Sequence, residues 1–178
     1  MKKWQKLSSK IVYQNPWIKV LEDKVIRPDK REGIYGYLIK PVGVFVLPVD
    51  TNGTIYLIHQ FRYPIKKYIY EIPGGVVNKN ETLLQNAKRE LKEETGITAK
   101  SWKRIGSYYA AAGHETTKMV VYLATNIDIS NYTRSLSDGD EIISKIIKLD
   151  KIDLIKMIKT GKISCGITLA AISLWLSQ

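Results

Sequence analysis

The sequence predicts an α/β protein, of the α+β kind, in which a mixed sheet packs between helices. Three observations support this fold class. Apolar and β-branched runs with strand character fill the first half of the chain. Apolar residues then recur at helical spacing from Glu81 to Glu94. After that helix, strand-like runs resume and two helical segments close the chain.

Periodicity and turn residues place the expected elements. Strands are expected at 17–26, 33–39, 42–49, 54–60, 68–72, 103–109, 119–125 and 142–149. Residues 50–53 have the composition of a hairpin turn. The helix from Glu81 to Glu94 takes Asn80 as its expected N-cap and Gly96 as its stop. Further helices are expected at 152–160 and 166–176.

Length and composition restrict the class of protein. The 178 residues allow one domain with its own core, expected to span 1–178. No run approaches the roughly 18 to 20 apolar residues of a membrane span, and the basic N-terminus lacks a signal-peptide apolar stretch. The single cysteine, Cys165, excludes an intrachain disulfide. We therefore expect a cytoplasmic protein without a membrane partner.

The formal net charge of +11 has two interpretations. It could attract polyanions such as nucleotides or RNA, or it could reflect compositional drift. The 22 lysines and six arginines are scattered, whereas a nucleic-acid reader more often clusters arginines among aromatic residues. The sequence therefore favours drift and argues against a nucleic-acid partner.

A cluster of carboxylates carries the chemistry. Glu90, Glu93 and Glu94 lie three and four residues apart, on one face of the expected helix. A hard divalent cation would relieve their mutual repulsion, because Mg2+ prefers carboxylate oxygens. The alternative is a solvated acidic helix face. The Gly74–Gly75 pair favours the metal, since it lets the backbone fold close to a ligand. Arg89 is expected to pair with Glu81, eight residues back.

The chain from Gly75 to Ile97 is identified as a Nudix box. Gly75, five residues, Glu81, seven residues and then Arg89-Glu90-Leu91-Lys92-Glu93-Glu94-Thr95-Gly96-Ile97 fit GX5EX7REUXEEXGU, with U a bulky aliphatic residue. The resemblance implies a Nudix-type α/β/α sandwich with a mixed sheet and an N-terminal antiparallel strand extension. It also implies hydrolysis of a diphosphate that links a nucleoside to another group.

The same resemblance implies roles within the box. The implied metal ligands are the Gly74 carbonyl, Glu90, Glu93 and Glu94, with Glu93 and Glu94 also assigned to catalysis. The implied structural positions are Gly75, Glu81 and Arg89. The expected cofactor is Mg2+, for which Mn2+ could substitute.

Nearly the whole chain resembles the ADP-ribose pyrophosphatase branch of the family. The segments that carry this likeness are 15–17, 33–38, 60–64, 70–74 and the helical pair around Gly161 and Thr168. The branch implies substrate contacts at Arg62 and Glu71, and a base stacked on Trp17. The alternatives are a surface salt bridge for Arg62 and core packing, which we favour, for Trp17. The branch also implies a homodimer, with residues 1–40 as dimerisation strands and 41–178 as catalytic core.

One segment departs from the branch. Its relatives carry a Ser-Pro-Gly-like turn followed by a glutamate, where this chain has Ala112 and Thr117. Glu115, two residues early, is the substrate-binding candidate here, and His114 could contact phosphate or lie on the surface. Further along, the resemblance makes Glu141 the general base or a metal ligand. Its neighbours Asp138 and Asp140 could replace it, and a solvated acidic turn is the alternative.

The expected function is Mg2+-dependent hydrolysis of ADP-ribose, or a related nucleoside diphosphate sugar, to a nucleoside monophosphate and a sugar phosphate. One alternative is a pyrophosphohydrolase that acts on RNA 5′ ends or dinucleoside polyphosphates. A second is a non-catalytic nucleotide-binding sensor, which the intact box disfavours.

Overall fold

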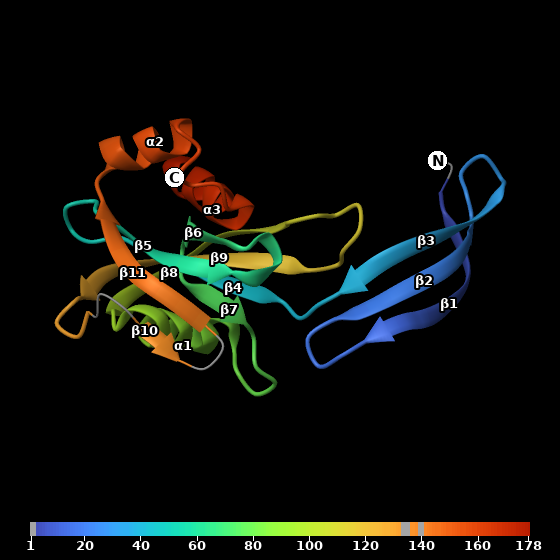
Figure 1. Ribbon diagram of the computed structural model, residues 1–178, viewed down its shortest axis with the longest axis horizontal. Coiled ribbons are helices and arrows are strands. Elements are labelled where there is room, and N and C mark those ends of the chain that lie inside the picture. Colours follow the sequence, from blue (N-terminus) through green and yellow to red (C-terminus); the bar gives the residue numbers. More distant parts are fainter. Residues whose placement is uncertain (1–2, 133–135, 139–140) are drawn as a thin grey trace. The chain divides into compact units, whose positions relative to one another are not determined.

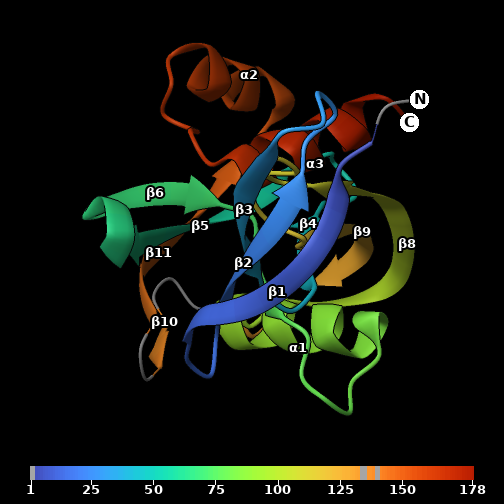
Figure 2. The same ribbon diagram turned by 90° about the vertical axis from the view of Figure 1, so that its right-hand side faces the viewer.

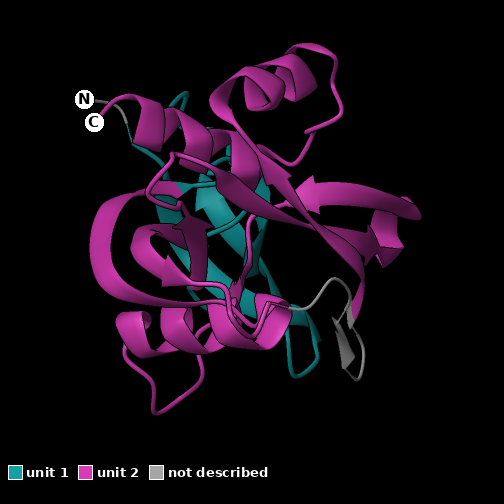
Figure 3. Cartoon of the chain, turned by 90° about the vertical axis from the view of Figure 1, so that its left-hand side faces the viewer, with its two compact units in different colours: residues 1–42, 109–118 teal, residues 43–108, 119–178 magenta. Residues whose placement is uncertain are grey.

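The computed structural model (Figure 1) describes residues 3–132, 136–138 and 141–178 of the chain, with side chains for 3–132 and 142–178. The chain divides into two compact units (Figure 3). Unit 1 comprises residues 1–42 and 109–118, and unit 2 comprises residues 43–108 and 119–178.

Unit 1 is built on an antiparallel three-stranded sheet in the order β1-β2-β3 (Figure 2). Its strands are β1 (Gln5–Gln14), β2 (Lys19–Ile26) and β3 (Glu32–Ile39). Segment 109–118 joins β3 through hydrogen bonds of 2.9 Å from the Leu38 amide to the His114 carbonyl and 3.0 Å from the Thr116 amide to the Leu38 carbonyl. The N-terminal antiparallel extension is thus confirmed. Strand β1 was not expected, because its residues are largely polar and every one of them is exposed.

Unit 2 contains most of the remaining elements. They are β4 (Gly43–Pro48), β5 (Ile55–Arg62), the 3-10 turn η1 (Tyr63–Ile65), β6 (Lys67–Glu71), β7 (Gly74–Val76), α1 (Leu83–Thr95), β8 (Thr98–Tyr109), β9 (Lys118–Asp128), β10 (Leu136–Asp138), β11 (Glu141–Leu149), α2 (Lys151–Lys159) and α3 (Gly166–Leu176). The three-residue strands β7 and β10 were not expected, since so short a run carries no readable period.

The strands of unit 2 form two four-stranded sheets, ordered β7-β4-β9-β8 and β10-β11-β5-β6. The first is mixed, because β4 pairs parallel to β9 and antiparallel to β7. Helix α1 lies on one side of the sheets, and α2 and α3 lie on the other (Figure 1). The expected mixed sheet between helices is therefore confirmed. No helix in the described part of the chain is long and apolar enough to span a membrane.

The core of unit 2 explains why β4 and β5 are almost continuously apolar. Leu47, Ile55 and Leu57 are fully buried and belong to one cluster with Leu154 and Ile172 of the C-terminal helices. Strands covered on both faces need apolar side chains at successive positions rather than at alternate ones. The expected turn at 50–53 joins β4 to β5, with a hydrogen bond of 3.1 Å from the Gly53 amide to the Asp50 carbonyl.

Helix α1 begins two residues later than expected. Its N-cap is Thr82, not Asn80, because Thr82 and Gln85 form a reciprocal capping box. The Thr82 side chain accepts from the Gln85 amide at 3.2 Å, and the Gln85 side chain accepts from the Thr82 amide at 2.8 Å. Glu81 therefore stays outside the helix. The helix ends at Gly96 as expected, where φ is +70°, a conformation that favours glycine.

Candidate functional site

Two buried carboxylates of α1 face the Gly74–Gly75 turn. Glu90 and Glu94 lie one helical turn apart, and both are buried. The Gly74 amide donates to Glu94 Oε2 at 2.8 Å. A Cβ atom added to Gly75 would come within 2.5 Å of Glu90 Oε1. The two glycines thus allow the backbone to lie directly against the carboxylates, and the predicted close approach to a ligand or metal remains a prediction.

Arg89 contacts three carboxylates at once. Its Nε lies 2.8 Å from Glu81 Oε1, its Nη2 lies 2.8 Å from Glu90 Oε1, and its Nη1 lies 2.7 Å from Glu93 Oε2. The predicted Arg89–Glu81 pair is therefore confirmed. Hydrogen bonds from Arg89 and then Asn86 hold the pKa of Glu81 at about 2, and those carboxylates in turn raise the pKa of Arg89. Glu93 is the most exposed of the three carboxylates.

Asn86 is a structural residue that sequence reasoning missed. Its amide nitrogen donates to the Val76 carbonyl at 2.9 Å and to Glu81 Oε2 at 3.2 Å, and the residue is fully buried. These bonds tie the end of β7 and the loop before α1 to the helix. The sequence signal for this role was the position of Asn86 next to Ala87, within the apolar stripe of the helix. A side-chain amide buried there without hydrogen bonds would destabilise the fold.

The donor set at this turn fits a hard divalent cation. Glu90, Glu94 and the backbone at Gly74 offer oxygen ligands, which Mg2+ and similar ions prefer. In the described part of the chain, no three His, Cys, Asp or Glu side chains converge on one point. Glu93 is held by Arg89 rather than gathered with the other two carboxylates. Its predicted ligand and catalytic roles remain predictions.

The substrate-binding candidates Arg62 and Glu71 contact each other. Arg62, at the end of β5, donates from Nε to Glu71 Oε2 at 2.6 Å. Glu71 is buried at the end of β6, and Arg62 remains partly exposed. The Ile72 amide donates to Thr168 Oγ1 at 3.1 Å, which fixes this end of β6 against α3. Burial, followed by the negative charge of Glu71, raises the pKa of Cys165.

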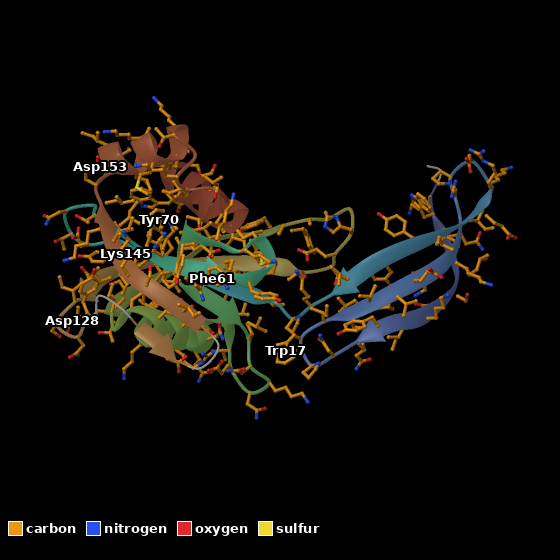
Figure 4. The ribbon with its side chains drawn as sticks, viewed as in Figure 1. Trp17, Phe61, Tyr70, Asp128, Lys145 and Asp153 are labelled. Carbon is orange, nitrogen blue, oxygen red and sulfur yellow. The ribbon has the colours of Figure 1, made fainter. Side chains whose placement is uncertain are left out.

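Trp17 and Glu115 belong to unit 1. Trp17 is 72% exposed in the turn between β1 and β2 (Figure 4), so the core-packing alternative was wrong. Asn15 Oδ1 shapes that turn by accepting from the amides of Trp17 at 2.9 Å and Ile18 at 2.8 Å. Glu115 pairs with Lys40 Nζ at 2.5 Å, and its side chain is buried.

The remaining candidates are His114, Glu141, Asp138 and Asp140, and the structure describes the side chain of His114 alone among them. His114 is exposed, as its surface alternative requires. The Glu141 backbone begins β11 and pairs with Asp138 of β10. The side chains of Glu141 and Asp138, and the whole of Asp140, lie outside the described residues. The predicted roles of these three residues remain predictions.

Family comparison agrees with this geometry. Residues 39–162, which contain the glycine turn and the glutamate helix, match the model of the NUDIX domain. The chain belongs to the Nudix hydrolase family. Members generally use divalent metal cations. Residues 4–38 match a second model, the nucleoside diphosphate sugar hydrolase N-terminal domain.

Curated relatives of this Nudix hydrolase include three informative proteins. An ADP-ribose pyrophosphatase of Bacillus subtilis (strain 168) is 34% identical over 69% of this chain and 65% of its own length, just under two thirds. A methanol dehydrogenase activator of Bacillus methanolicus is 26% identical over 90% of this chain and 86% of its own. An ADP-sugar pyrophosphatase of Mus musculus is 27% identical over 86% of this chain and 70% of its own.

Solved structures confirm the Nudix fold. A crystal structure of an ADP compounds hydrolase superposes with a TM-score of 0.85 and covers 99% of this chain and 94% of its own. At 17% identity, this likeness bears on the fold alone.

Proposed function

We propose that this Nudix hydrolase cleaves the diphosphate of ADP-ribose, or of a related nucleoside diphosphate sugar, in a Mg2+-dependent reaction. The products are a nucleoside monophosphate and a sugar phosphate. The observation that carries the proposal is the burial of Glu90 and Glu94 directly against the Gly74–Gly75 turn. Carboxylate oxygens held beside a backbone turn are the kind of ligand that a hard divalent cation such as Mg2+ prefers.

The residues that would hold the cation are Glu90, Glu94 and the Gly74 carbonyl, joined by Glu93. A divalent cation bound there would neutralise phosphate charge and would supply Lewis acidity that activates water. Arg89 holds the Glu90 and Glu93 carboxylates in place beforehand, through bonds of 2.8 and 2.7 Å. Glu141 is the proposed general base, with Glu93 and Glu94 assisting catalysis. Mn2+ is the proposed substitute ion.

Arg62 is the proposed phosphate-binding residue. Its planar guanidinium can grip two phosphate oxygens at once, which a lysine cannot do. Glu71 holds the Nε of Arg62 at 2.6 Å and so restricts the orientation of the guanidinium. We assign Trp17, which is exposed, to stacking on the nucleobase, and Glu115 to a further substrate contact.

The relatives support a nucleoside diphosphate sugar as the substrate class. The Bacillus subtilis and mouse proteins are named for ADP-ribose and ADP-sugars, and the N-terminal family model is named for nucleoside diphosphate sugars. That N-terminal model matches residues 4–38, and the NUDIX model matches residues 39–162.

We also propose a homodimer formed through residues 1–40, with residues 41–178 as catalytic core. Unit 1 leaves large apolar side chains in solvent, and contiguous exposed apolar surface commonly marks an interface. The exposed side chains of its sheet are Leu7, Ile11, Val12, Tyr13, Ile34 and Ile39.

A substrate panel tests the proposal. The purified chain is incubated with ADP-ribose, ADP-glucose, UDP-glucose, diadenosine tetraphosphate or 5′-triphosphorylated RNA, with Mg2+, Mn2+ or EDTA. Products are separated by anion-exchange chromatography. The expected result is Mg2+-dependent release of AMP and ribose 5-phosphate from ADP-ribose, with ADP-glucose second.

Other results of the panel would overturn the proposed substrate or activity. A preference for diadenosine tetraphosphate or for 5′-triphosphorylated RNA would show that the enzyme is a pyrophosphohydrolase of dinucleoside polyphosphates or of RNA 5′ ends. Nucleotide binding without turnover of any substrate, with every ion, would show a sensor. The Glu94→Gln variant serves as the control for contaminating hydrolases.

A further inference from the structure

A row of four rings crosses strands β5 and β6. The rings of Tyr70 and His59 stack with centroids 4.4 Å apart, and those of His59 and Tyr68 stack at 5.2 Å. Phe61 continues the row beside Tyr68 at 5.3 Å, with its plane tilted. We call these four residues the ring row. Tyr70 anchors one end against the core, Phe61 at the other end is half-buried, and Tyr68 between His59 and Phe61 is 46% exposed to solvent.

The ring row lies on the opposite sheet face from Arg62. Successive side chains of a strand point to opposite faces, so His59 and Phe61 share one face while Gln60 and Arg62 share the other. The pairings of His59 with Tyr70, and of Phe61 with Tyr68, place those tyrosines on the face of the ring row. The row is therefore separate from the Arg62–Glu71 pair of the proposed hydrolase site.

Lys145 extends the same face onto β11. It pairs with His59 across the strands, and its ammonium lies 6.0 Å from the centroid of Tyr70. Figure 4 shows Phe61, Tyr70 and Lys145 on these adjoining strands. His59 Nδ1 lies 2.8 Å from Ser144 Oγ, which fixes the imidazole in the row. Burial, and then the charge of Lys145, lowers the pKa of His59, so its ring is neutral near pH 7.

The charged residues of these strands are mostly cationic. Within the described side chains of 55–71 and 142–149, the cationic residues are Arg62, Lys66, Lys67, Lys145 and Lys148. Glu71 is the sole carboxylate among them, and Arg62 already pairs with it. Lys67 pairs with Arg62 and Lys148 pairs with Tyr56, so these cations lie on the opposite face of the sheet. The cations left to the ring-row face are Lys145 and Lys66, which lies in the turn between β5 and β6. Stacking rings combined with positive charge are the features that bind single-stranded nucleic acid without sequence preference.

We propose that the ring-row face of the β11-β5-β6 sheet binds single-stranded nucleic acid. Bases stack on Tyr68, the exposed ring of the row, and phosphates lie near Lys145 and Lys66. RNA and DNA strands share this chemistry, so the test includes both. The binding is independent of the proposed hydrolysis, because it uses the other face of the sheet.

Fluorescence anisotropy tests this proposal with labelled strands of about 12 nucleotides, within the range of such binding sites. The probes are oligo-uridine RNA, oligo-thymidine DNA and an abasic phosphodiester strand of equal length. We expect binding of at least one natural strand, with affinity at least about tenfold above that of the abasic strand. Comparison of the affinities for RNA and for DNA then shows which of the two nucleic acids the face prefers.

Matched variants separate stacking from charge. Tyr68→Ala should weaken binding about tenfold, whereas Tyr109→Ala, at an exposed tyrosine outside the row, should leave it unchanged. Lys145→Ala should reduce the slope of log affinity against log salt by about 0.7, and Lys159→Ala of α2 should not. Tyr68→Ala and Lys145→Ala should both keep the wild-type melting temperature to within a few degrees, and both should keep hydrolase activity.

Four kinds of result would overturn the proposal. The first is no binding of either natural strand up to about 100 μM protein, the weak end of non-specific affinity. The second is equal binding of natural and abasic strands, or no effect of Tyr68→Ala. The third is displacement of the strand by saturating ADP-ribose, which would place it in the hydrolase site. The fourth is a change of oligomeric state in Tyr68→Ala by sedimentation equilibrium, which would show that a second copy covers this face.

Discussion

The two units differ in whether their charged and apolar side chains have partners within the chain. Around α1 in unit 2, Arg89 pairs with Glu81, Glu90 and Glu93 within 2.8 Å, so a dense group of charges is satisfied internally. In unit 1, by contrast, β1 is exposed along its whole length and carries apolar side chains such as Ile11 in solvent. The charged side chains around α1 therefore have partners within the chain, whereas the apolar side chains of β1 remain exposed.

The largest expected effect comes from breaking the carboxylate pair of unit 2. Glu94→Gln keeps the shape of the side chain and an oxygen that can accept from the Gly74 amide, but it removes the negative charge. We expect turnover of ADP-ribose to fall at least about a hundredfold, with an unchanged melting temperature. Product release is measured by chromatography, and Glu32→Gln, at an exposed glutamate of unit 1, is the control. Near-full activity in Glu94→Gln would refute the metal-site assignment.

The second prediction tests whether unit 1 needs a partner. Ile11→Glu places a charge on the exposed apolar surface of β1, which an interface could bury only at a high cost. We expect the dimer dissociation constant to rise about thirtyfold, the scale of one interface hot spot. Sedimentation equilibrium measures it. Ser8→Glu adds the same charge to the opposite face of β1 and should have less effect. A wild-type chain that is monomeric at all concentrations would remove the proposed dimer.

A smaller effect is expected from a substitution that keeps the charge. Arg62→Lys retains the positive charge but loses the planar fork, and it also replaces the Nε contact to Glu71. We expect KM for ADP-ribose to rise about tenfold with a smaller change in kcat. Steady-state kinetics measures both, with Arg104→Lys of β8 as the matched control. An unchanged KM would show that Arg62 serves the fold rather than the substrate.

The smallest effect concerns acid stability. The folded pKa of Glu81 is about 2, below the usual value of a free glutamate, because Arg89 and Asn86 hydrogen-bond to its charged form. Its contribution to stability is therefore present above about pH 4.5 and is lost as pH falls toward 2. The free energy of unfolding, measured in urea, should be lower for Glu81→Gln than for wild type at pH 6. The difference between the two proteins should be smaller at pH 3. A difference that widens in acid would contradict this assignment.

The sequence predicted the helix of the Nudix box because its signals are local and dense. Helical spacing, the paired glycines and the Arg89–Glu81 distance of eight residues all fit one helix with an entry loop. The N-cap was misplaced because Asn80 and Thr82 are both good caps. Gln85, three residues after Thr82, was the signal that decides between them.

Other features depended on contacts that a sequence does not display. Whether Glu93 faces a metal or Arg89 is a choice of side-chain orientation on the same helix face. Strand β1 lacks the alternation of a half-buried strand, because both of its faces are exposed. The ring row depends on the register between β5 and β6, which brings His59 beside Tyr70 eleven residues later. The likeness to a family supported Trp17 as a ligand contact, and its exposure removed only the core alternative.

The position of Arg89 has a consequence for handling the protein. It acts as an internal counter-ion for Glu81, Glu90 and Glu93. Many small metallo-domains unfold when a chelator strips their ion, because the ligands alone cannot stay together. Here the guanidinium supplies a permanent positive charge to the box. EDTA should therefore abolish activity reversibly while the chain stays folded. Metal-free protein can then be stored and later reactivated by adding back the ion.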